Sequence, residues 1–235
     1  MRPLDDLLDD DPAWPVIASW IAEATNQVVV LPAAREEGEK LLLRLQLTSH
    51  SALGAVALET GGMLVDHGWL RLLGSGSPEL RSTLASWNTI DDEPEVPPLQ
   101  NALTVGFDAV GGFFAVNGGE FDAAEGDVHY FAPDTLEWSS LERGYSDFLH
   151  WALTGDLAAF YAELRWPGWE DELAGVGGDL GFSLVPPPFT REGRPVSAVS
   201  RRLVPMRELW LVQQDYARRL ADAPDGTEMR LEVEN

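Results

Sequence analysis

The stretch from Gly111 to Leu141 constrains the fold more than any other part of the sequence. Two apolar runs flank Asn117-Gly118-Gly119 and an acidic loop, and a third segment ends on Trp138. Asn and Gly tolerate the positive φ angles that tight turns require, so apolar runs on both sides of them indicate a β-hairpin. The middle of the chain is therefore expected to form antiparallel strands.

Helices and strands are interspersed along the rest of the chain. Apolar periodicity, with Asp11, Ser51, Ser77 and Asp156 as N-cap residues, predicts helices. These helices cover residues 11–24, 51–60, 78–87, 145–153, 156–164 and 205–220. Val-rich or alternating runs predict strands at 27–31, 41–48, 63–65, 69–73, 103–108 and 182–185, with a further edge strand at 227–233. Gly61-Gly62 is expected to close the helix that precedes it.

This mixture predicts an α+β fold, with a largely antiparallel sheet flanked by helices, in a single domain over residues 1–235. Such a length buries a sizeable core without disulfides or metals. Residues 89–100 combine Asp91-Asp92-Glu93 with Pro97-Pro98, a composition typical of an exposed acidic, proline-rich loop. Because the composition is similar on both sides of this loop, no domain boundary is expected there.

The charge of the chain limits its partners. Asp and Glu total 39 against 16 Lys and Arg, which gives a net charge of −23. This charge repels nucleic acid phosphates and anionic membranes and favours cationic partners. We therefore expect no nucleic acid and no membrane, and a basic protein as the partner. The same charge also serves solubility, so a docking surface and a plain solvated surface both stay open.

The sequence also indicates the compartment. It contains no cysteine, which fits a reducing cytoplasm and excludes disulfides, thiolate nucleophiles and Cys-ligated zinc. No run of 18 apolar residues predicts a transmembrane helix. The first 11 residues are acidic and lack the apolar core of a secretory signal. We expect a cytoplasmic protein.

Signatures of enzymes are missing. The four histidines are far apart in sequence, and no His-Glu-x-x-His zinc motif is present. Gly175–Gly181 resembles a dinucleotide fingerprint, but its last glycine comes one residue late and a strand-like run follows. The phosphate loop with Gly-Lys-Ser and the hydrolase pattern Gly-x-Ser-x-Gly are absent. No catalytic residue, cofactor or metal ligand is predicted, and a non-enzymatic role is favoured.

Four carboxylates form the most conspicuous group in the chain: Glu120, Asp122, Glu125 and Asp127. Carboxylates at alternate positions can coordinate calcium, and a pair can act as acid and base on a glycoside. The calcium-loop pattern that ends in a closing Glu is absent, and acidic residues beside glycine commonly form turns. The loop is thus either a site or a turn, and the turn is preferred.

Two further regions are candidates for contacts. Trp166 and Trp169 flank Pro167-Gly168, where a ring can stay partly exposed and anchor an interface, although a core position is preferred. Between Arg191 and Arg219, seven arginines face three acidic residues. These arginines either pair internally, the preferred interpretation, or form a small anion-binding patch around Arg191, Arg194, Arg201 and Arg202.

Several long motifs carry a family resemblance. They are Leu53-Gly54-Ala55, Thr60-Gly61-Gly62, Gly68–Gly74, Phe113–Gly119, Gly126–Trp138, Tyr145–Trp151, Phe160-Tyr161 and Arg165–Trp169. With these motifs, nearly the whole chain resembles an uncharacterised bacterial family, domain-of-unknown-function family 2625. That family implies no activity and no catalytic residue.

A more distant likeness rests on Asn117-Gly118-Gly119, Gly126-Asp127 and Trp138. These residues are similar to the superfamily of toxin-immunity proteins related to yeast cell-wall regulators of the Smi1/Knr4 type. The resemblance implies an α+β domain that binds proteins, with many members acting as acidic inhibitors of nuclease toxins.

Three functions therefore remain in view. The leading one is a non-enzymatic, immunity-like protein-binding module whose candidate surface comprises Glu120, Asp122, Glu125, Asp127, Trp166 and Trp169. The second is a small-molecule binder or an enzyme that uses the carboxylates of the 120–127 loop. The third is an oligomeric housekeeping protein with Trp166 and Trp169 at its interface.

Overall fold

The computed structural model describes residues 1–88 and 96–221. The predicted strand at 227–233 and residues 89–95 of the predicted acidic loop lie outside these ranges. Of the rest of that loop, Val96 is buried and Pro97 is exposed.

Nine strands form two antiparallel sheets in the described residues. The large sheet contains β1 (Val28–Pro32), β2 (Thr60–Val65), β3 (Leu70–Leu73), β4 (Ala102–Asp108), β5 (Phe113–Asn117), β6 (Asp127–Ala132) and β7 (Glu137–Gly144). The small sheet pairs β8 (Leu180–Val185) with β9 (Ser200–Pro205).

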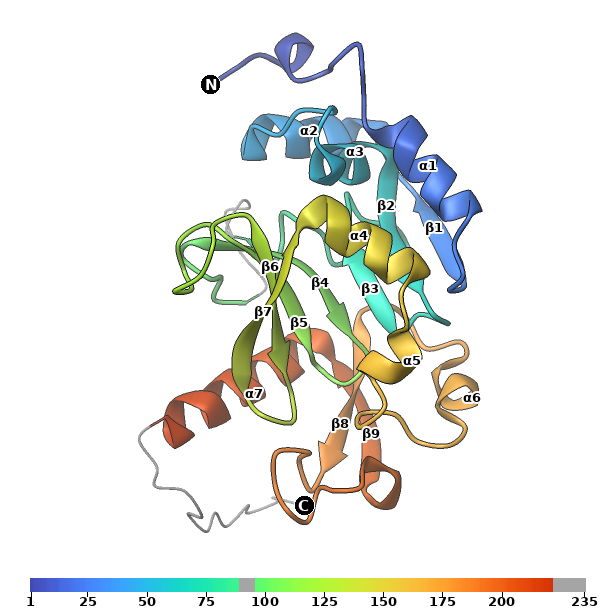
Figure 1. The fold of residues 1–235 in the computed structure, drawn as a ribbon, viewed down its shortest axis with the longest axis vertical. Coiled ribbons are helices and arrows are strands. Elements are labelled where there is room, and N and C mark those ends of the chain that lie inside the picture. The colour runs from blue at the N-terminus through green and yellow to red at the C-terminus, as the bar shows by residue number, and fades with distance from the viewer. Residues whose placement is uncertain (89–95, 222–235) are drawn as a thin grey trace.

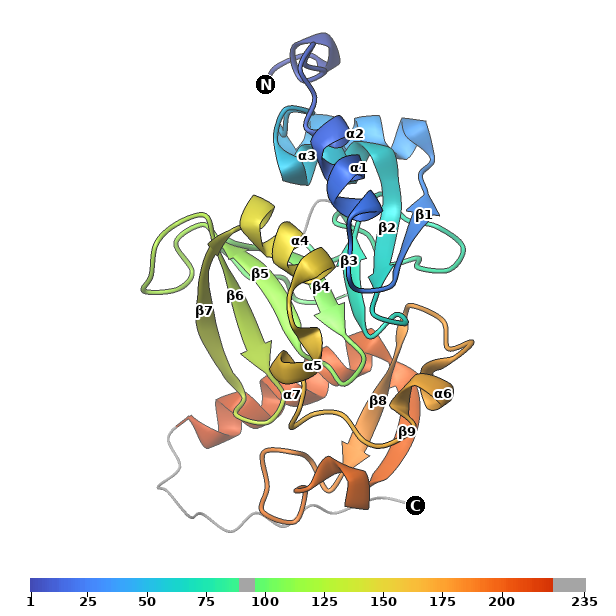
Figure 2. The ribbon, with the colours of Figure 1, turned by 45° about the vertical axis from the view of Figure 1, so that its right-hand side comes forward.

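Helices surround these sheets. They are α1 (Trp14–Ala22), α2 (Arg35–Leu45), α3 (Ala52–Glu59), α4 (Tyr145–Thr154), α5 (Leu157–Phe160), α6 (Trp169–Leu173) and α7 (Met206–Leu220). Two 3-10 helices lie at Leu4–Asp6 and Val196–Ala198. In Figures 1 and 2, α1–α3 gather at one end of the molecule, beside β1 and β2, and α7 lies near the opposite end, where the small sheet is found. The prediction of an α+β fold with a largely antiparallel sheet flanked by helices is confirmed.

The large sheet is a meander, because its strand order follows the chain from β1 to β7 and each strand is antiparallel to the one before. The hairpin predicted around Asn117-Gly118-Gly119 is confirmed as β5 and β6, with Phe113 opposite Phe131 and Val116 opposite Val128. The segment around Trp138 does not end there. It begins β7, which continues to Gly144.

Both faces of the sheet centre are covered, and β5 shows how. Successive side chains of a strand point to opposite faces. Phe113 packs on Trp210 of α7, with ring centroids 4.7 Å apart, and Phe114 packs on Phe148 of α4 at 5.0 Å. A strand buried on both faces must be apolar at every position, which explains the unbroken run of Phe113–Val116.

Residues 41–48 were predicted to form a strand, and this is wrong. Residues 41–45 continue a helix, α2, and Gln46 is its C-cap, with a left-handed φ of 55°. Leu41 and Leu42 are buried, and Arg35 pairs with Glu39 at the i,i+4 spacing that supports helices. The alternation Leu43-Arg44-Leu45-Gln46 resembles a strand, but Leu43 and Leu45 are only half-buried, and Leu41 and Leu42 are the residues that the helix buries.

The helix predicted at 78–87 is also wrong, because this segment forms turns. The Ser77 hydroxyl accepts hydrogen bonds from the backbone N–H groups of Glu79 and Leu80, as an N-cap would. The next two backbone N–H groups, of Arg81 and Ser82, donate instead to the Asp179 carboxylate. A partner about a hundred residues away thus takes the groups that a helix would have used.

Three predicted helix boundaries also differ from the structure. Ser51 caps α3 as predicted, through a bond from the Gly54 N–H, but Gly61-Gly62 belongs to β2 and does not close the helix. Asp11 is not the N-cap of α1, because Ala13 takes that position without a side-chain bond. Asp156 caps its helix, which is much shorter than predicted. Strand β9 was not predicted.

Candidate functional site

The acidic loop between β5 and β6 is organised from within by Asn117, the last residue of β5. Its Nδ2 atom donates to the carbonyl oxygens of Phe121, Ala123 and Ala124, at 3.1–3.2 Å. Its Oδ1 atom accepts from the backbone N–H groups of Gly119 and Phe121, both at 3.0 Å. The Asn117 side chain is buried. One amide thus satisfies five backbone groups and sets the shape of the loop.

The four loop carboxylates do not converge. Glu120, Asp122 and Glu125 are exposed, and Asp127 is a half-buried residue at the start of β6. Glu120 accepts a bond from the backbone N–H of Asn101 at 2.8 Å, which ties the loop to the residue before β4. Across residues 1–88 and 96–221, no group of three or more potential metal ligands is found. Of the four carboxylates, Glu120 contributes to the shape of the loop through its bond to Asn101.

The two tryptophans of the candidate surface differ in accessibility. Trp166 is 2% exposed, and its Nε1 atom donates to Glu172 at 2.9 Å while the Arg201 guanidinium lies 4.5 Å from its ring centroid. Trp169, the first residue of α6, is half-buried. Of the pair, Trp169 is the one whose ring can touch a partner without rearrangement.

Trp169 rests on an arginine held between aromatic rings. The Arg165 guanidinium carbon lies 4.1 Å from the Trp169 ring centroid, 4.8 Å from that of Trp69 and 5.0 Å from that of Tyr161. The same guanidinium pairs with the Asp66 carboxylate. Only a tenth of the Arg165 side chain is exposed. Arginine suits this position because its planar group stacks on rings and pairs with a carboxylate at once.

The β2–β3 turn that carries Asp66 has an uncommon backbone. Asp66 and His67 have φ angles of 51° and 57°, in the left-handed region that non-glycine residues seldom adopt. Gln27 holds the turn: its carbonyl accepts the Asp66 N–H at 2.7 Å, and its side-chain oxygen accepts the His67 N–H at 2.9 Å. This geometry places the Asp66 carboxylate beside Arg165.

A cavity of about 390 Å³ opens beside this cluster. We call it the Trp169 groove. Its lining residues come from the loop before β1, the β2–β3 turn, the region of α5, and α6. They are Asn26, Asp66, Gly155, Asp156, Leu157, Ala158, Ala162, Arg165, Trp169 and Glu170. Three carboxylates and one already paired guanidinium face it. The groove therefore combines negative charge with an accessible indole ring.

The six residues of the predicted surface lie in two separate parts of the molecule. In Figures 1 and 2 the β5–β6 loop projects from one side of the molecule, and α6 lies on the other. Asp66, Asp156 and Glu170 were not among the site residues predicted from the sequence, although Asp156 was predicted as an N-cap. In the sequence, Asp66 stood out only as a residue between two predicted strands and Asp156 only as an N-cap, which are ordinary local roles. Glu170 had no signal of its own.

Five of the seven arginines between Arg191 and Arg219 form ion pairs within the chain. Arg194 pairs with Asp134, Arg201 with Glu172 and Arg202 with Glu208. Arg218 and Arg219 both pair with Asp215. Three of the four residues of the predicted anion-binding patch are thus engaged with carboxylates.

A buried carboxylate, Asp108, was also missed. Its oxygens accept bonds from the N–H groups of Val110 and Gly112 and from the Tyr130 hydroxyl at 2.7 Å, which fixes the turn from β4 to β5. Burial raises the pKa of the Asp108 carboxyl. Burial also lowers the pKa of the nearby Arg71 guanidinium to about 10. Both groups lie inside the fold.

Comparison with known proteins assigns the family. The family model described as "Protein of unknown function DUF2625" matches residues 4–209. The chain belongs to this family. The resemblance noted in the long sequence motifs is thereby confirmed, and the match includes every residue of the Trp169 groove.

Two relatives of the chain are uncharacterized proteins. YbfG of Escherichia coli (strain K12), described as uncharacterized, is 39% identical over 214 residues, which are 91% of this chain and 96% of the relative. An uncharacterized protein of Haemophilus influenzae is 36% identical over 187 residues, 79% of this chain and 82% of the relative. No solved structure matches. Within the described residues, no helix has both the length and the apolar character needed to cross a bilayer.

Proposed function

We propose that the protein is a non-enzymatic protein-binding module of the cytoplasm, whose acidic surface receives a basic protein partner. The observation that carries this proposal is the Trp169 groove, where three carboxylates surround a half-buried indole. A lysine or arginine side chain of the partner fits this chemistry, because a cation is attracted both by carboxylates and by the face of a tryptophan.

The groove leaves room for such a contact. Asp156 is exposed, and more than half of the Glu170 side chain is accessible. Asp66, by contrast, is committed to Arg165, so it positions that cation under the ring and is not free for a partner. A partner side chain would therefore lie between Asp156, Glu170 and the exposed part of Trp169.

The overall charge supports the same role. A net charge of −23 attracts a basic protein over a distance and accelerates its association, and salt screens this effect. The likeness to immunity proteins, carried by Asn117-Gly118-Gly119 and Trp138, suggests a basic toxin as the partner class. In the structure, Asn117 shapes the β5–β6 loop, which is a role that needs no toxin. The suggestion of a basic toxin therefore depends on the charge and the groove.

Capture from the source bacterium tests the proposal with charge-matched baits. The groove variant is Asp156→Asn/Glu170→Gln, the loop variant is Asp122→Asn/Glu125→Gln, and the control is Asp5→Asn/Asp6→Asn at the exposed N-terminal segment. All three remove two negative charges. Asn keeps the capping role of Asp156.

We expect the wild type, the loop variant and the control to retain a basic protein that the groove variant retains at least tenfold less. The yield of the retained protein, quantified by mass spectrometry at low and moderate salt, is the measurement. Recovery of no protein at either salt would refute a protein partner. Equal recovery by the groove variant and the control would refute the groove as the contact.

A further inference from the structure

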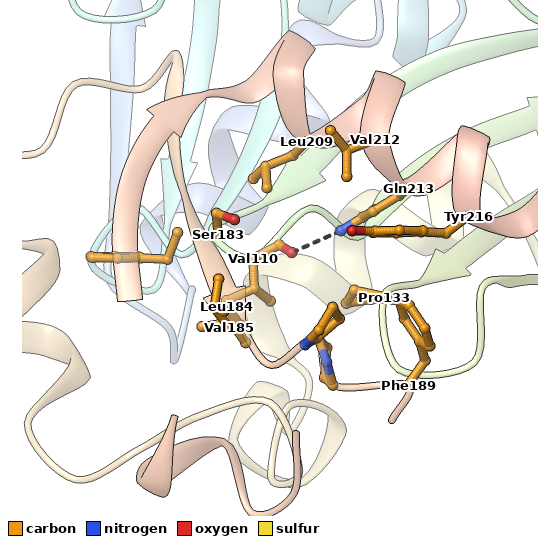
Figure 3. Close-up of a pocket in the computed structure, with 13 residues that line it drawn as sticks. Val110, Pro133, Ser183, Leu184, Val185, Phe189, Leu209, Val212, Gln213 and Tyr216 are labelled. Carbon is orange, nitrogen blue, oxygen red and sulfur yellow. Dashed lines mark hydrogen bonds between the residues drawn. The ribbon is translucent and has the colours of Figure 1, made fainter. Parts of the chain in front are cut away.

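A second cavity lies beneath α7, at the junction with the small sheet. Its volume is about 130 Å³. Figure 3 shows Leu209, Val212, Gln213 and Tyr216 of α7 along one side and Ser183–Val185 of β8 along the other. It shares no lining residue with the Trp169 groove. The two cavities are therefore separate.

The cavity contains one buried polar group with unused capacity. Gln213 is 8% exposed, and its Nε2 atom donates to the Val110 carbonyl at 3.2 Å (Figure 3). A carbonyl can only accept, so this bond determines which end of the amide faces it. The Oε1 atom is buried and has no hydrogen-bond partner among the described residues. An acceptor left in that condition costs about 1–3 kcal/mol.

The backbone holds Gln213 in this position. Gly111 has a φ of 85°, and a Cβ atom there would lie 2.5 Å from the Gln213 Nε2 atom. A residue with a side chain at 111 would both strain the turn and displace the amide. The turn after β4 is thus shaped to admit Gln213.

The remaining walls are mainly apolar. Val110, Leu184, Val212 and Phe189 line them, and the Phe189 ring packs on Tyr216 with centroids 5.2 Å apart. None of the lining residues carries a formal charge at neutral pH. A charged ligand would lose its hydration without compensation, which is strongly unfavourable.

We propose that this cavity is a binding site for a small, uncharged molecule with a flat apolar body and one O–H or N–H group, which donates to Gln213 Oε1. An apolar cavity of about 150 Å³ is known to hold benzene, so a volume of about 130 Å³ is of the order needed for a single small ring. Mostly apolar walls with a few placed polar groups are typical of ligand sites. The Ser183 hydroxyl and the Tyr216 side chain supply further polar atoms in the lining.

Phenol and toluene are suitable probes, because they have equal numbers of heavy atoms and differ in the hydroxyl donor. Both are titrated into the full chain with ¹³C-labelled methyl groups, and shifts of the Val110, Leu184 and Leu209 methyls are followed by NMR. We expect saturable shifts with both probes and a roughly tenfold tighter dissociation constant for phenol, which corresponds to one hydrogen bond of about 1.4 kcal/mol.

Two variants and a control separate the contributions. Gln213→Leu removes the acceptor, so the affinity for phenol should fall about tenfold, to that for toluene. The affinity for toluene should stay within twofold of its wild-type value. Val212→Phe narrows the cavity from a helix position that is 42% exposed, so it should abolish both sets of shifts. Leu211→Phe, at the neighbouring position that is 47% exposed and does not line the cavity, should change neither.

The proposal is wrong if neither probe shifts these methyls up to its solubility limit. It is also wrong if Val212→Phe and Leu211→Phe bind the probes alike, which would place binding elsewhere on the surface. Equal affinities of phenol and toluene for the wild type would refute the role of Gln213. The Val212 and Leu211 variants keep the test decisive if Gln213→Leu does not fold.

Discussion

The β5–β6 loop and the Trp169 groove both contain several carboxylates, but they differ in how those carboxylates come together. In the loop, Glu120, Asp122 and Glu125 are neighbours in sequence and diverge into solvent. In the groove, Asp66, Asp156 and Glu170 are separated by up to about a hundred residues and line one cavity. Nearness in sequence is thus a poor guide to a site, because a turn directs successive side chains apart.

The two regions also differ in what stabilises them. The loop depends on one buried amide, Asn117, which bonds to the backbone. The groove depends on one buried cation, Arg165, which bonds to side chains from distant segments. Each support can be removed alone, so the comparison can be tested directly.

The largest effect is expected from Arg165→Ala. It leaves Asp66 without its partner in a partly buried position and removes the group on which Trp69, Tyr161 and Trp169 pack. Breaking a buried ion pair from one side costs about 3–5 kcal/mol, and we expect the free energy of unfolding to fall by about 3 kcal/mol. Urea unfolding followed by tryptophan fluorescence measures it. Arg165→Lys keeps the charge without the planar stack and should lose less.

A change below about 1 kcal/mol for Arg165→Ala would mean that the groove does not depend on this cation. The distinction between the two regions would then fail on the groove side.

Asn117→Ala should have the next largest effect. It removes the hydrogen-bond partner of five backbone groups in the loop. Because the loop is exposed, water can replace some of these hydrogen bonds. We expect a loss of about 2 kcal/mol in the free energy of unfolding, from the usual cost of unmade hydrogen bonds. Hydrogen exchange of the Gly119 and Phe121 amides should also accelerate. Unchanged exchange at both amides would show that Asn117 does not organise the loop.

The buried Asp108 provides a third setting for a carboxylate, with a smaller and pH-dependent effect. Burial raises the pKa of the Asp108 carboxyl above the ordinary value of 3.8. At a pH between the unfolded and the folded pKa, the folded state therefore holds a proton that the unfolded chain has released. The contribution of Asp108 to stability is therefore fully present below the unfolded pKa and is lost as the pH rises through the folded pKa. Asp108→Asn lacks this titration.

We expect the free energy of unfolding of the wild type, taken relative to Asp108→Asn, to decrease as the pH rises above about 4. Urea unfolding of both proteins at pH 4, 5, 6 and 7 gives this difference. A difference that stays constant over the series would show that Asp108 is ionised in the folded state throughout.

The smallest effects on stability are expected from the exposed carboxylates of both regions. Asp122→Asn/Glu125→Gln and Asp156→Asn/Glu170→Gln should each change the free energy of unfolding by less than about 0.5 kcal/mol, as is usual for surface substitutions. Thermal unfolding measures this. The two variants should then differ only in partner binding. A large loss of stability from the loop variant would give its acids a structural role beyond that of Asn117.

Local patterns in the sequence predicted much of the sheet. Asn117-Gly118-Gly119 identified the β5–β6 hairpin because its turn chemistry needs no distant partner. Ser51 and Asp156 were identified as caps for the same reason. The period of residues 205–220 predicted a helix, and α7 buries Met206, Leu209, Trp210 and Gln213.

The errors arose where distant residues decide a local structure. Residues 78–87 have a helical pattern, but Asp179 binds the N–H groups of Arg81 and Ser82 and draws the segment into turns. Residues 41–48 fit either period, and the choice of helix follows from packing between α2 and α3. Neither competitor is visible in the segment itself.

The candidate sites followed the same division. The sequence showed an acidic chain, a hairpin at Asn117-Gly118-Gly119 and two tryptophans beside a Pro-Gly break. It could not show that Trp166 is enclosed while Trp169 stays accessible, since this depends on Glu172 and Arg201 closing over one ring only. Local chemistry therefore determined the strands and turns of this protein. Which carboxylates share a cavity, and which polar atom of Gln213 is left without a partner, was decided by the packing of segments far apart in the chain.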